Sequence, residues 1–210
     1  MQSGQARQQS VSGVILAGGL GIRMGGDKAN RCLLDKPLTE WVAAALAGQC
    51  DELLINVGPG EASPLPEYAT VTDCIAGYAG PLAGVHAAMR TARFPWLVSA
   101  PCDTPFLPPD LVVRLMAQAE PEVEAVVATV GGKRQPTVVL YRTHLHARLE
   151  SFLQAGGRRA GEWLNGLSLA EAEFANAVGF VNINTVLELQ RADEILRNGG
   201  DAQDVCRAFI

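Results

Sequence analysis

A glycine-rich loop with two cations is the part of this sequence best suited to chemistry on a ligand. Residues 14–28 read V-I-L-A-G-G-L-G-I-R-M-G-G-D-K, with five glycines between positions 18 and 26 and with Arg23 and Lys28 in the same loop. Glycine lets the backbone come close to a ligand, so that amide groups can point at phosphate oxygens. Arginine and lysine offset negative charge that amides cannot neutralise alone. The loop therefore favours a triphosphate ligand.

Two familiar phosphate-binding loops do not fit this segment. The P-loop pattern G-x-x-x-x-G-K-[ST] needs its lysine directly after the second glycine, whereas here Asp27 intervenes. The dinucleotide pattern G-x-G-x-x-G, started at Gly19, would need a third glycine where Met24 stands.

A carboxylate in a rigid turn is the second candidate. Asp103 follows the apolar segment 96–100 and lies between Pro101 and Pro105. A carboxylate fixed at the end of a strand is well placed to hold Mg²⁺, which prefers oxygen ligands. The alternative is a helix N-cap, because a helix is expected over residues 108–119.

Composition limits the classes of protein. The chain has 210 residues, 48% hydrophobic and 19% charged, which fits one folded domain. A net charge of −5 argues against nucleic-acid binding, and no apolar run is long enough for a membrane span. Five scattered cysteines form no C-x-x-C pair, which predicts reduced thiols and a cytoplasmic location. We expect a disordered lead over residues 1–10, a single domain over 11–200 and a C-terminal tail over 201–210.

Apolar segments alternate with amphipathic ones along the chain. Strands are expected over residues 14–17, 52–57, 70–72, 96–100, 123–130 and 137–141, the last two joined by a turn at Gly131-Gly132. Helices are expected over residues 38–48, 81–92, 108–119, 143–154 and 185–197. This alternation predicts an α/β fold, with a mostly parallel twisted sheet and helices on both faces. Ligands of such sheets bind outside the carboxyl ends of the strands, which brings the loops after Ala17 and Ala100 and the side chain of Asn56 to one edge.

Several motifs occur in an order typical of one family. The opening signature L-A-G-G-x-x-x-R-M-G-x-D-K is followed by G-P-L-A-G at residues 80–84 and by P-C-D-T-P-F at 101–106. Q-P-T at 135–137, G-R-R at 157–159 and V-N-I-N-T at 181–185 complete the set. Together they resemble the molybdenum cofactor guanylyltransferases, nucleotidyltransferases that are similar to sugar-nucleotide pyrophosphorylases. The resemblance extends over nearly the whole chain.

The resemblance implies a three-layer Rossmann-like nucleotidyltransferase fold and transfer of GMP from GTP to the terminal phosphate of molybdopterin. It implies Mg²⁺ as cofactor, with Mn²⁺ as an alternative ion, and Asp103 as the metal ligand. It also implies transient contacts with cofactor-synthesis proteins or recipient molybdoenzymes. The N-terminal half would bind GTP and the C-terminal half molybdopterin. The implied catalytic residues are Arg23, Lys28 and Asp103, the implied GTP contacts are Leu16, Ala17, Gly18, Gly19, Lys28, Asn56, Asp73, Gly80, Gly84 and Asp103, and the implied molybdopterin contacts are Arg158, Arg159, Asn182 and Asn184.

Each of these roles has a plainer structural alternative. Asp73, which the family uses for the base or its ribose, is also a good turn residue, as is Asn56. The glycines at 80 and 84 leave room for a base or pterin, or else for tight packing of a helix on the sheet. The arginine pair at 158–159 could be solvated, and Asn184 could cap the last helix.

Two further observations bear on the family resemblance. The segment 29–36 contains no glycine where the family has a glycine-containing turn, so it is expected to fold differently. Cytidylyltransferases for the same cofactor typically read L-A-A-G where this chain has L-A-G-G at 16–19, and the extra glycine would make room for guanine. A cytidylyltransferase is the closest alternative function, followed by a sugar-phosphate nucleotidyltransferase and by a non-catalytic nucleotide-binding module.

Overall fold

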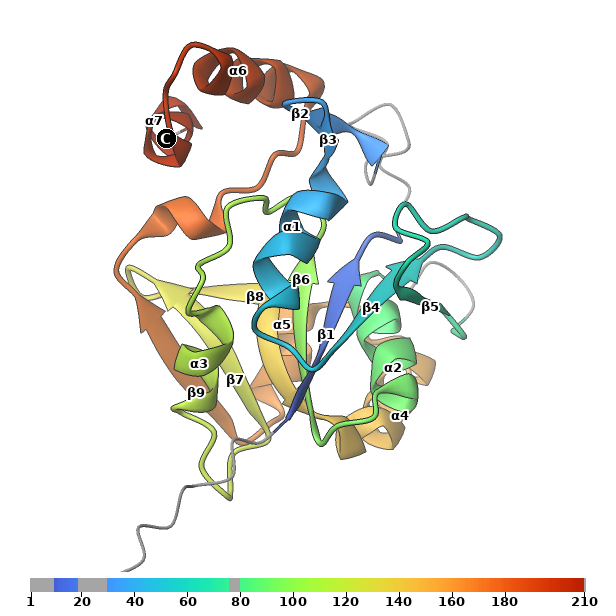
Figure 1. Cartoon of the computed structure of the whole chain (residues 1–210). Helices are drawn as coiled ribbons and strands as arrows, with labels where there is room; N and C mark the ends of the chain where they lie inside the picture. The colour runs from blue at the N-terminus through green and yellow to red at the C-terminus, as the bar shows by residue number, and fades with distance from the viewer. Residues whose placement is uncertain (1–9, 19–29, 76–79, 210) are drawn as a thin grey trace, which may run out of the picture.

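The computed structural model describes residues 10–18, 30–75 and 80–209. Within these ranges the chain forms a seven-stranded sheet of order β5-β4-β1-β6-β8-β7-β9 (Figure 1). Neighbouring strands are parallel except where β8 pairs with β6 and with β7. The predicted α/β fold with a mostly parallel sheet is confirmed. The strands are β1 (Val11–Leu16), β4 (Glu52–Val57), β5 (Ala69–Thr72), β6 (Trp96–Pro101), β7 (Ala125–Val130), β8 (Lys133–Arg142) and β9 (Leu169–Phe174).

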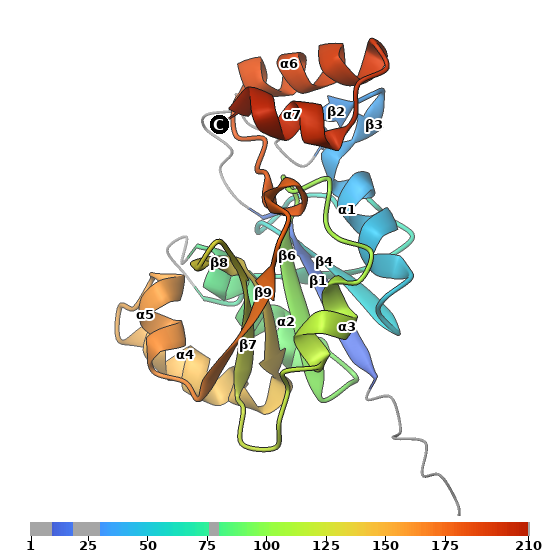
Figure 2. The same cartoon turned by 90° about the vertical axis from the view of Figure 1, so that its left-hand side faces the viewer.

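Helices cover both faces of this sheet (Figures 1 and 2). They are α1 (Leu38–Ala47), α2 (Pro81–Thr91), α3 (Leu111–Met116), α4 (His146–Gln154), α5 (Ala160–Asn165), α6 (Val186–Arg197) and α7 (Ala202–Phe209), with short 3-10 turns at η3 (Thr143–Leu145) and η4 (Ala177–Phe180). No helix in the described ranges has the length and apolar character needed to cross a bilayer.

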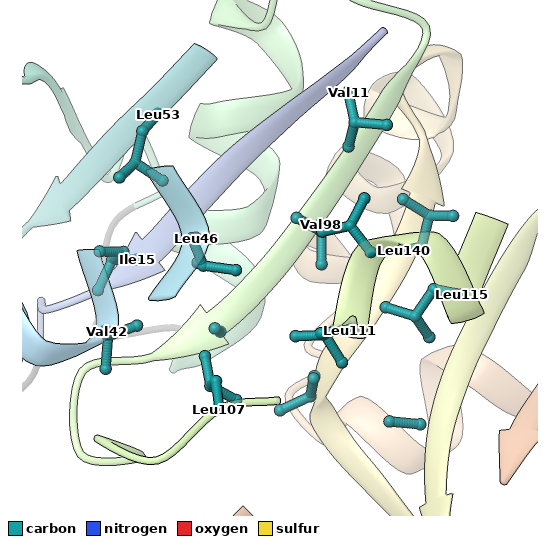
Figure 3. Close-up of a cluster of buried hydrophobic side chains, with 14 of the residues drawn as sticks. Val11, Ile15, Val42, Leu46, Leu53, Val98, Leu107, Leu111, Leu115 and Leu140 are labelled. Atoms are coloured by element: carbon teal, nitrogen blue, oxygen red, sulfur yellow. The ribbon is translucent and has the colours of Figure 1, made fainter. Parts of the chain in front are cut away.

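The central strand β1 is buried on both sides, and its side chains alternate between two hydrophobic clusters. Ile15 packs in the cluster that contains Val42 and Leu46 of α1, part of which Figure 3 shows. Val14 points the other way, into the cluster that contains Leu82 of α2. Full burial of one such aliphatic side chain stabilises a fold by about 1.5–3 kcal/mol. This burial fixes the register of the strands whose ends carry the candidate site.

Residues 30–37 form a small antiparallel hairpin, β2 (Cys32–Leu33) and β3 (Lys36–Pro37). Its two turn residues, Leu34 and Asp35, have positive φ angles of 51° and 63°. Such angles are unfavourable for residues with a side chain. The turn is held from α6, because the Leu34 N–H donates to Asp193 Oδ1 (2.7 Å) and Arg197 pairs with Asp35 (2.9 Å). Contacts with α6 therefore stabilise a turn that has no glycine.

The last residues extend the fold. Residues 202–209, expected as part of a tail, form α7 instead and bury Val205 and Cys206. Val205 joins a third cluster with Leu33 of the hairpin and Ile183, and Figure 2 shows α6 and α7 beside β2 and β3. The apolar stripe along 205–209 gives α7 a face to bury, which is why this segment is ordered against the hairpin.

Other elements differ in extent from the sequence predictions. The helix expected over residues 108–119 is confined to Leu111–Met116, because Pro108 and Pro109 form a turn in which the Pro108 carbonyl accepts from the Leu111 N–H (3.2 Å). The strand β9 and the helix α5 were not predicted. The turn expected at Gly131-Gly132 does join β7 to β8.

Candidate functional site

Three parallel strands end side by side at one edge of the sheet. Leu16 at the end of β1 is in register with Asn56 of β4 and with Pro101 of β6. Beyond it, the Ala17 N–H donates to the Asn56 carbonyl (2.9 Å), and the Cys102 N–H donates to the Leu16 carbonyl (3.3 Å). The predicted convergence of these strand ends is confirmed.

Asn56 and Asp73 form a hydrogen-bonded pair at this edge. Asn56 is only 2% exposed, and its Nδ2 donates to Asp73 Oδ1 (2.8 Å) and to the Val71 carbonyl (3.4 Å). The pairing of β4 with β5 sets Asn56 opposite Val71, which places Asp73 just past the end of β5. Both residues were predicted as nucleotide contacts, and the structure places them side by side at this edge.

Glycines enclose the Asn56 side chain. A Cβ on Gly84 of α2 would lie 2.1 Å from Asn56 Oδ1 and 3.0 Å from Leu16 Cδ2. A Cβ on Gly18 would lie 3.2 Å from the same oxygen and 2.9 Å from the backbone of Val57 and of Gly58. The space at Gly84 is therefore filled by protein, as the packing alternative predicts, and not left open for a ligand. The space at Gly18 is likewise taken by the loop after β4.

Gly80 has a different reason to be glycine. It lies at the N-cap position of α2 with φ 72° and ψ −165°, and a Cβ there would meet nothing within 4 Å. Its carbonyl accepts from the Ala83 N–H (3.0 Å). The backbone conformation requires glycine here, because residues with a side chain rarely adopt it. Gly80 is exposed at the site, so it stays a candidate for contact with GTP.

The Asp73 carboxyl lies in an environment that disfavours its charge. Burial raises its pKa above the ordinary value of 3.8, the hydrogen bond from Asn56 acts in the opposite direction, and Glu61 raises the pKa further. Glu61 is anchored to the loop after β4 by the Gly58 N–H (3.0 Å). A half-buried carboxylate of this kind is stabilised by a ligand that donates hydrogen bonds to it.

Behind the pair lies His86 of α2, which is completely buried. Neither ring nitrogen has a hydrogen-bond partner within the described part of the chain, and Nε2 is 3.8 Å from Glu150 of α4. Burial lowers the pKa of His86, Glu150 opposes that change, Arg90 and His146 add to it, and Asp73 opposes it. His86 is therefore a neutral side chain within the core at neutral pH.

Asp103 lies in the turn that follows β6, at the same edge. It is 4% exposed, and its backbone carbonyl accepts from the Ile183 N–H (2.9 Å). The neighbouring Thr104 is 1% exposed, with its hydroxyl 3.3 Å from the Pro101 carbonyl and 3.4 Å from Asn182 Oδ1. The N-cap position of α3 belongs to Asp110. Asp103 is therefore not the helix cap that the alternative interpretation required.

The Asp103 carboxylate suits a hard divalent ion that is bound largely through its substrate. No group of three or more His, Cys, Asp or Glu side chains in the described ranges could hold a metal. Mg²⁺ commonly binds to one or two carboxylates, with phosphates and water completing its shell. A single carboxylate such as that of Asp103 fits that mode and not an all-protein cage.

The segment 182–184 joins the Asp103 turn to α6. Ile183 is buried between two asparagines, of which Asn182 is exposed and Asn184 half-buried. Thr185 and Glu188 form a capping box at the start of α6, and Glu188 also accepts from the Asn184 N–H (2.7 Å). Thr185 is thus the cap of this helix. Asn182 and Ile183 thus lie against the turn of Asp103 and Thr104 although they are about 80 residues away in sequence.

The two predicted arginines differ in their surroundings. Arg158 Nη1 donates to the carbonyls of Leu153 and Gly157 (both 2.7 Å), so it caps the end of α4. The Arg159 side chain is 83% exposed and forms a surface pair with Glu162 (3.0 Å). The structure therefore gives Arg158 a local structural contact, while Arg159 extends into solvent.

Three predicted residues, Gly19, Arg23 and Lys28, lie outside the described residues. Two residues of the described site were not predicted as functional. For Thr104, its position inside the P-C-D-T-P-F motif was the available signal. Glu61 follows a Gly-Pro-Gly turn and carried no signal in the sequence.

Comparison with known proteins agrees with this arrangement. The MobA-like NTP transferase domain family matches residues 13–170. The molybdenum cofactor guanylyltransferase of Cupriavidus taiwanensis is 39% identical over 194 residues, covering 87% of this chain and 96% of the relative. That of Shewanella pealeana is 37% identical over 193 residues, covering 90% and 96%.

Solved structures of other proteins have the same fold. The molybdopterin-guanine dinucleotide biosynthesis protein A of Archaeoglobus fulgidus superposes with a TM-score of 0.73 at 25% identity, covering 89% of this chain and 99% of that one. The 2-C-methyl-D-erythritol 4-phosphate cytidylyltransferase of Thermus thermophilus shares the fold, with a TM-score of 0.65 at 18% identity and coverage of 88% and 98%.

The fold and its carboxylate-bearing edge define an α/β nucleotidyltransferase. The length and identity of the matches make the assignment more specific. This chain belongs to the MobA-like NTP transferase family, within the group that contains the molybdenum cofactor guanylyltransferases.

Proposed function

We propose that this protein transfers GMP from GTP to the terminal phosphate of molybdopterin, with or without bound molybdenum. An oxygen of that phosphate attacks the α-phosphorus of GTP in line. The bond between the α-phosphorus and its bridge to the β-phosphate breaks, and pyrophosphate leaves. The acceptor phosphate is already a nucleophile, so no covalent enzyme intermediate is needed. The protein contributes positioning and electrostatic stabilisation.

The observation that carries this proposal is a pair of carboxylates at one edge of the sheet, each just past the end of a strand. Asp73 follows β5 and Asp103 follows β6, with Asn56 and Leu16 between them in the strand order. We assign Asp73 to the guanine base, whose N1–H and 2-amino groups donate to a carboxylate. We assign Asp103 to the phosphates. Relatives at 37–39% identity are named for the same activity.

Asp103 is the residue that would hold Mg²⁺, or Mn²⁺ as the alternative. Such an ion supplies neutralising charge to the phosphates when it is bound. Arg23 and Lys28, assigned from the sequence motif, bind the β- and γ-phosphates and the charge that develops on pyrophosphate.

The acceptor binds on the side of residues 182–184, because their backbone is hydrogen-bonded to the Asp103 turn. We assign the Asn182 and Asn184 amides to the pterin. Arg159 is the better candidate of the arginine pair for the acceptor phosphate, since Arg158 already bonds to two carbonyls. We further propose transient contacts with cofactor-synthesis proteins or recipient molybdoenzymes.

A transfer assay with labelled nucleotides tests the proposal. The protein is incubated with molybdopterin, Mg²⁺ and either α-labelled or γ-labelled GTP, and the same reaction is run with CTP. We expect the α-label in the dinucleotide product, the γ-label in pyrophosphate and little product from CTP. A preference for CTP would indicate a cytidylyltransferase. Binding of GTP without any transfer would indicate a non-catalytic module.

A further inference from the structure

The Q-P-T motif at residues 135–137 lies at an irregularity in the sheet. Val127 of β7 pairs with Val139 of β8. Two residues further along β7, Thr129 pairs with Arg134, which lies five residues away from Val139 in β8. The extra residues of β8 form a bulge that contains the motif. Proline has no N–H for the ladder and is tolerated at a bulge, and bulges often re-aim side chains next to functional sites.

This bulge lies at the edge of the sheet that carries the candidate site. Because β8 runs antiparallel to β6, it begins at the edge where β6 ends. Ser99 of β6 is in register with Val139, and its buried hydroxyl donates to the Thr137 carbonyl (3.0 Å). From Ser99 the chain continues through the end of β6 to Asp103. The Q-P-T motif therefore lies beside the strand end that leads to the Asp103 turn.

Two half-buried side chains of the motif have polar groups available at this edge. Among the residues that the structure describes, the Thr137 hydroxyl has no hydrogen-bond partner. The Gln135 amide nitrogen makes one long hydrogen bond there, to the Lys133 carbonyl (3.4 Å). By contrast, the Thr129 hydroxyl at the end of β7 already donates to Glu173 (2.6 Å). Gln135 and Thr137 can therefore donate to a ligand without giving up a short contact within the protein.

Strand alternation places Thr137 on the face of the sheet that α2 covers. Val138 belongs to the hydrophobic cluster on the α1 side, and Val139 belongs to the cluster on the α2 side. Successive side chains of a strand point to opposite faces, so Thr137 shares the face of Val139. Asn56 is on this face as well, because it lies against Gly84 of α2. The Thr137 side chain and the nucleotide side of the edge are thus on one face of the sheet.

The hairpin between β7 and β8 also carries an exposed cation. Lys133 forms no ion pair with any residue in the described ranges. Its neighbour Arg134 is held by Glu171 (2.7 Å) and by Asn165 of α5 (3.1 Å). In a chain with a net charge of −5, an exposed cation beside unused donors favours an anionic ligand.

The order of the strands indicates which anion this is. Asp73 follows β5, Asp103 follows β6, and β8 is the next strand beyond β6. With the base at Asp73 and the α-phosphate at Asp103, the β8 side is left for the group that attacks the α-phosphate. In the proposed reaction that group is a phosphate.

We propose that Gln135 and Thr137 are substrate-binding residues that donate hydrogen bonds to the terminal phosphate of the acceptor, with the charge of Lys133 nearby. This inference rests on the proposed function, which names the acceptor. It adds β8 to the acceptor side, besides residues 182–184, and it gives the Q-P-T motif a chemical role.

Thr137→Val tests the hydroxyl, because valine keeps the size and the β-branch of the side chain. The Kd for molybdopterin, measured by equilibrium binding without GTP, should rise by about tenfold to a hundredfold, as expected for a hydrogen bond to a charged group. The Kd for GTP, measured by calorimetry, should not change. Thr137→Ser restores the hydroxyl and should regain most of the affinity. Wild-type affinity for molybdopterin in Thr137→Val, or an equal loss for GTP, would overturn the inference.

Two substitutions of Gln135 distinguish a phosphate from the pterin ring. Gln135→Leu removes the donor, whereas Gln135→Glu sets a carboxylate in its place that repels a phosphate. For a phosphate contact, Gln135→Glu should weaken the binding of molybdopterin more than Gln135→Leu does. A contact with the pterin ring would give the opposite order, because the N–H and amino groups of the ring donate to a carboxylate. The opposite order, or wild-type affinity in both variants, would overturn the inference.

A matched control makes the same chemical change in another strand. Thr70 is exposed in β5, and four steps in the strand order separate β5 from β8. Thr70→Val should leave the Kd values for molybdopterin and for GTP at the wild-type level. An equal loss of affinity for molybdopterin in Thr70→Val would show that the effect does not depend on the position of the hydroxyl, and would overturn the inference.

These binding measurements do not depend on turnover, so the proposed function and the role of the motif can fail separately. If the wild type transfers labelled GMP while the variants of Thr137 and Gln135 bind molybdopterin normally, the role of the motif fails and the proposed function stands. If transfer fails while these variants lose affinity for molybdopterin as expected, the motif binds the phosphate in a protein that does not catalyse the transfer. If the wild type does not bind molybdopterin, both fail.

Discussion

Gly84→Ala is the substitution whose effect follows most directly from the structure. The new methyl group would lie 2.1 Å from Asn56 Oδ1 and 2.5 Å from Asn56 Cγ, far inside van der Waals contact. The Asn56 side chain cannot simply move away, because Gly18 and Asp73 border it. Either α2 shifts or the hydrogen bond to Asp73 breaks.

The expected loss of stability can be worked from these contacts. Overpacking a core site costs about 1–3 kcal/mol, and losing a hydrogen bond to a charged group costs about 1.5–3 kcal/mol. If both effects occur, the free energy of unfolding should decrease by about 2.5–6 kcal/mol, or roughly 5–24 °C in Tm for a chain of this size. GTP affinity should fall by about tenfold or more, because Asp73 loses its fixed orientation.

Calorimetry measures both quantities, by thermal unfolding and by GTP titration. The matched control is Gly161→Ala in α5, where a Cβ would meet nothing within 4 Å. That change should leave stability unchanged or raise it by up to about 1 kcal/mol. A Gly84→Ala protein with wild-type Tm and wild-type GTP affinity would refute the packing argument around Asn56.

The remaining predictions concern four polar side chains. Asp103→Asn should reduce the rate of GMP transfer by about a hundredfold or more with little change in Tm, measured by label transfer and thermal unfolding. Thr104→Val should raise the KM for molybdopterin and leave the KM for GTP unchanged, whereas Thr104→Ser keeps the hydroxyl and should resemble wild type in steady-state kinetics. Asp73→Ala should reduce the preference for GTP over ITP, which lacks the 2-amino group, in competition titrations. His86 has a lowered pKa in the folded state, so the unfolded protein binds the extra proton below the ordinary value of 6.5. Denaturant unfolding from about pH 7.5 to about pH 5.5 should therefore show a steeper loss of stability for wild type than for His86→Leu.

Each of these predictions has an outcome that contradicts it. Unchanged turnover in Asp103→Asn would show that Asp103 holds neither the metal ion nor the phosphates during transfer. Equal changes of both KM values in Thr104→Val would indicate general damage to the turn. Equal losses of affinity for GTP and for ITP in Asp73→Ala would indicate that Asp73 contacts the ribose and not the base. Identical pH profiles for wild type and His86→Leu would show that His86 is not the titrating group.

The elements that the sequence predicted are those with a strong local signal. The strands β1, β4 and β6 consist of nearly continuous apolar residues, as expected for a sheet covered on both faces. By contrast, β9 reads L-A-E-A-E-F, and alanine and glutamate favour helices. It is a strand because Ala172 and Phe174 bury one face when it pairs with β7. Tertiary pairing overrides propensity there, and no local pattern reveals it.

The candidate site could also be predicted only in part from the sequence. The positions of Asp73, Asn56 and Asp103 at strand ends could be predicted, because carboxyl ends of parallel strands share one edge. The hydrogen bond between Asn56 and Asp73 could not be predicted, since it depends on the register of β4 with β5. For the same reason, the sequence left open whether a ligand or protein atoms occupy the space beside Gly84, where the structure places Asn56.

The acceptor side depends on contacts between residues that are distant in sequence. Thr104 lies within hydrogen-bond reach of Asn182, 78 residues away, and the Asp103 carbonyl accepts from Ile183. No spacing rule links such positions. The arginine pair illustrates the opposite case, since the sequence treats Arg158 and Arg159 alike and only the fold distinguishes a helix-capping side chain from an exposed one.

Crystals soaked with Mg²⁺ and a non-hydrolysable GTP analogue give the most direct measurement of the central claim. We predict guanine within hydrogen-bonding distance of the Asp73 carboxylate and the α-phosphate beside Asp103. A base bound away from Asp73, or phosphates that do not approach Asp103, would contradict the account.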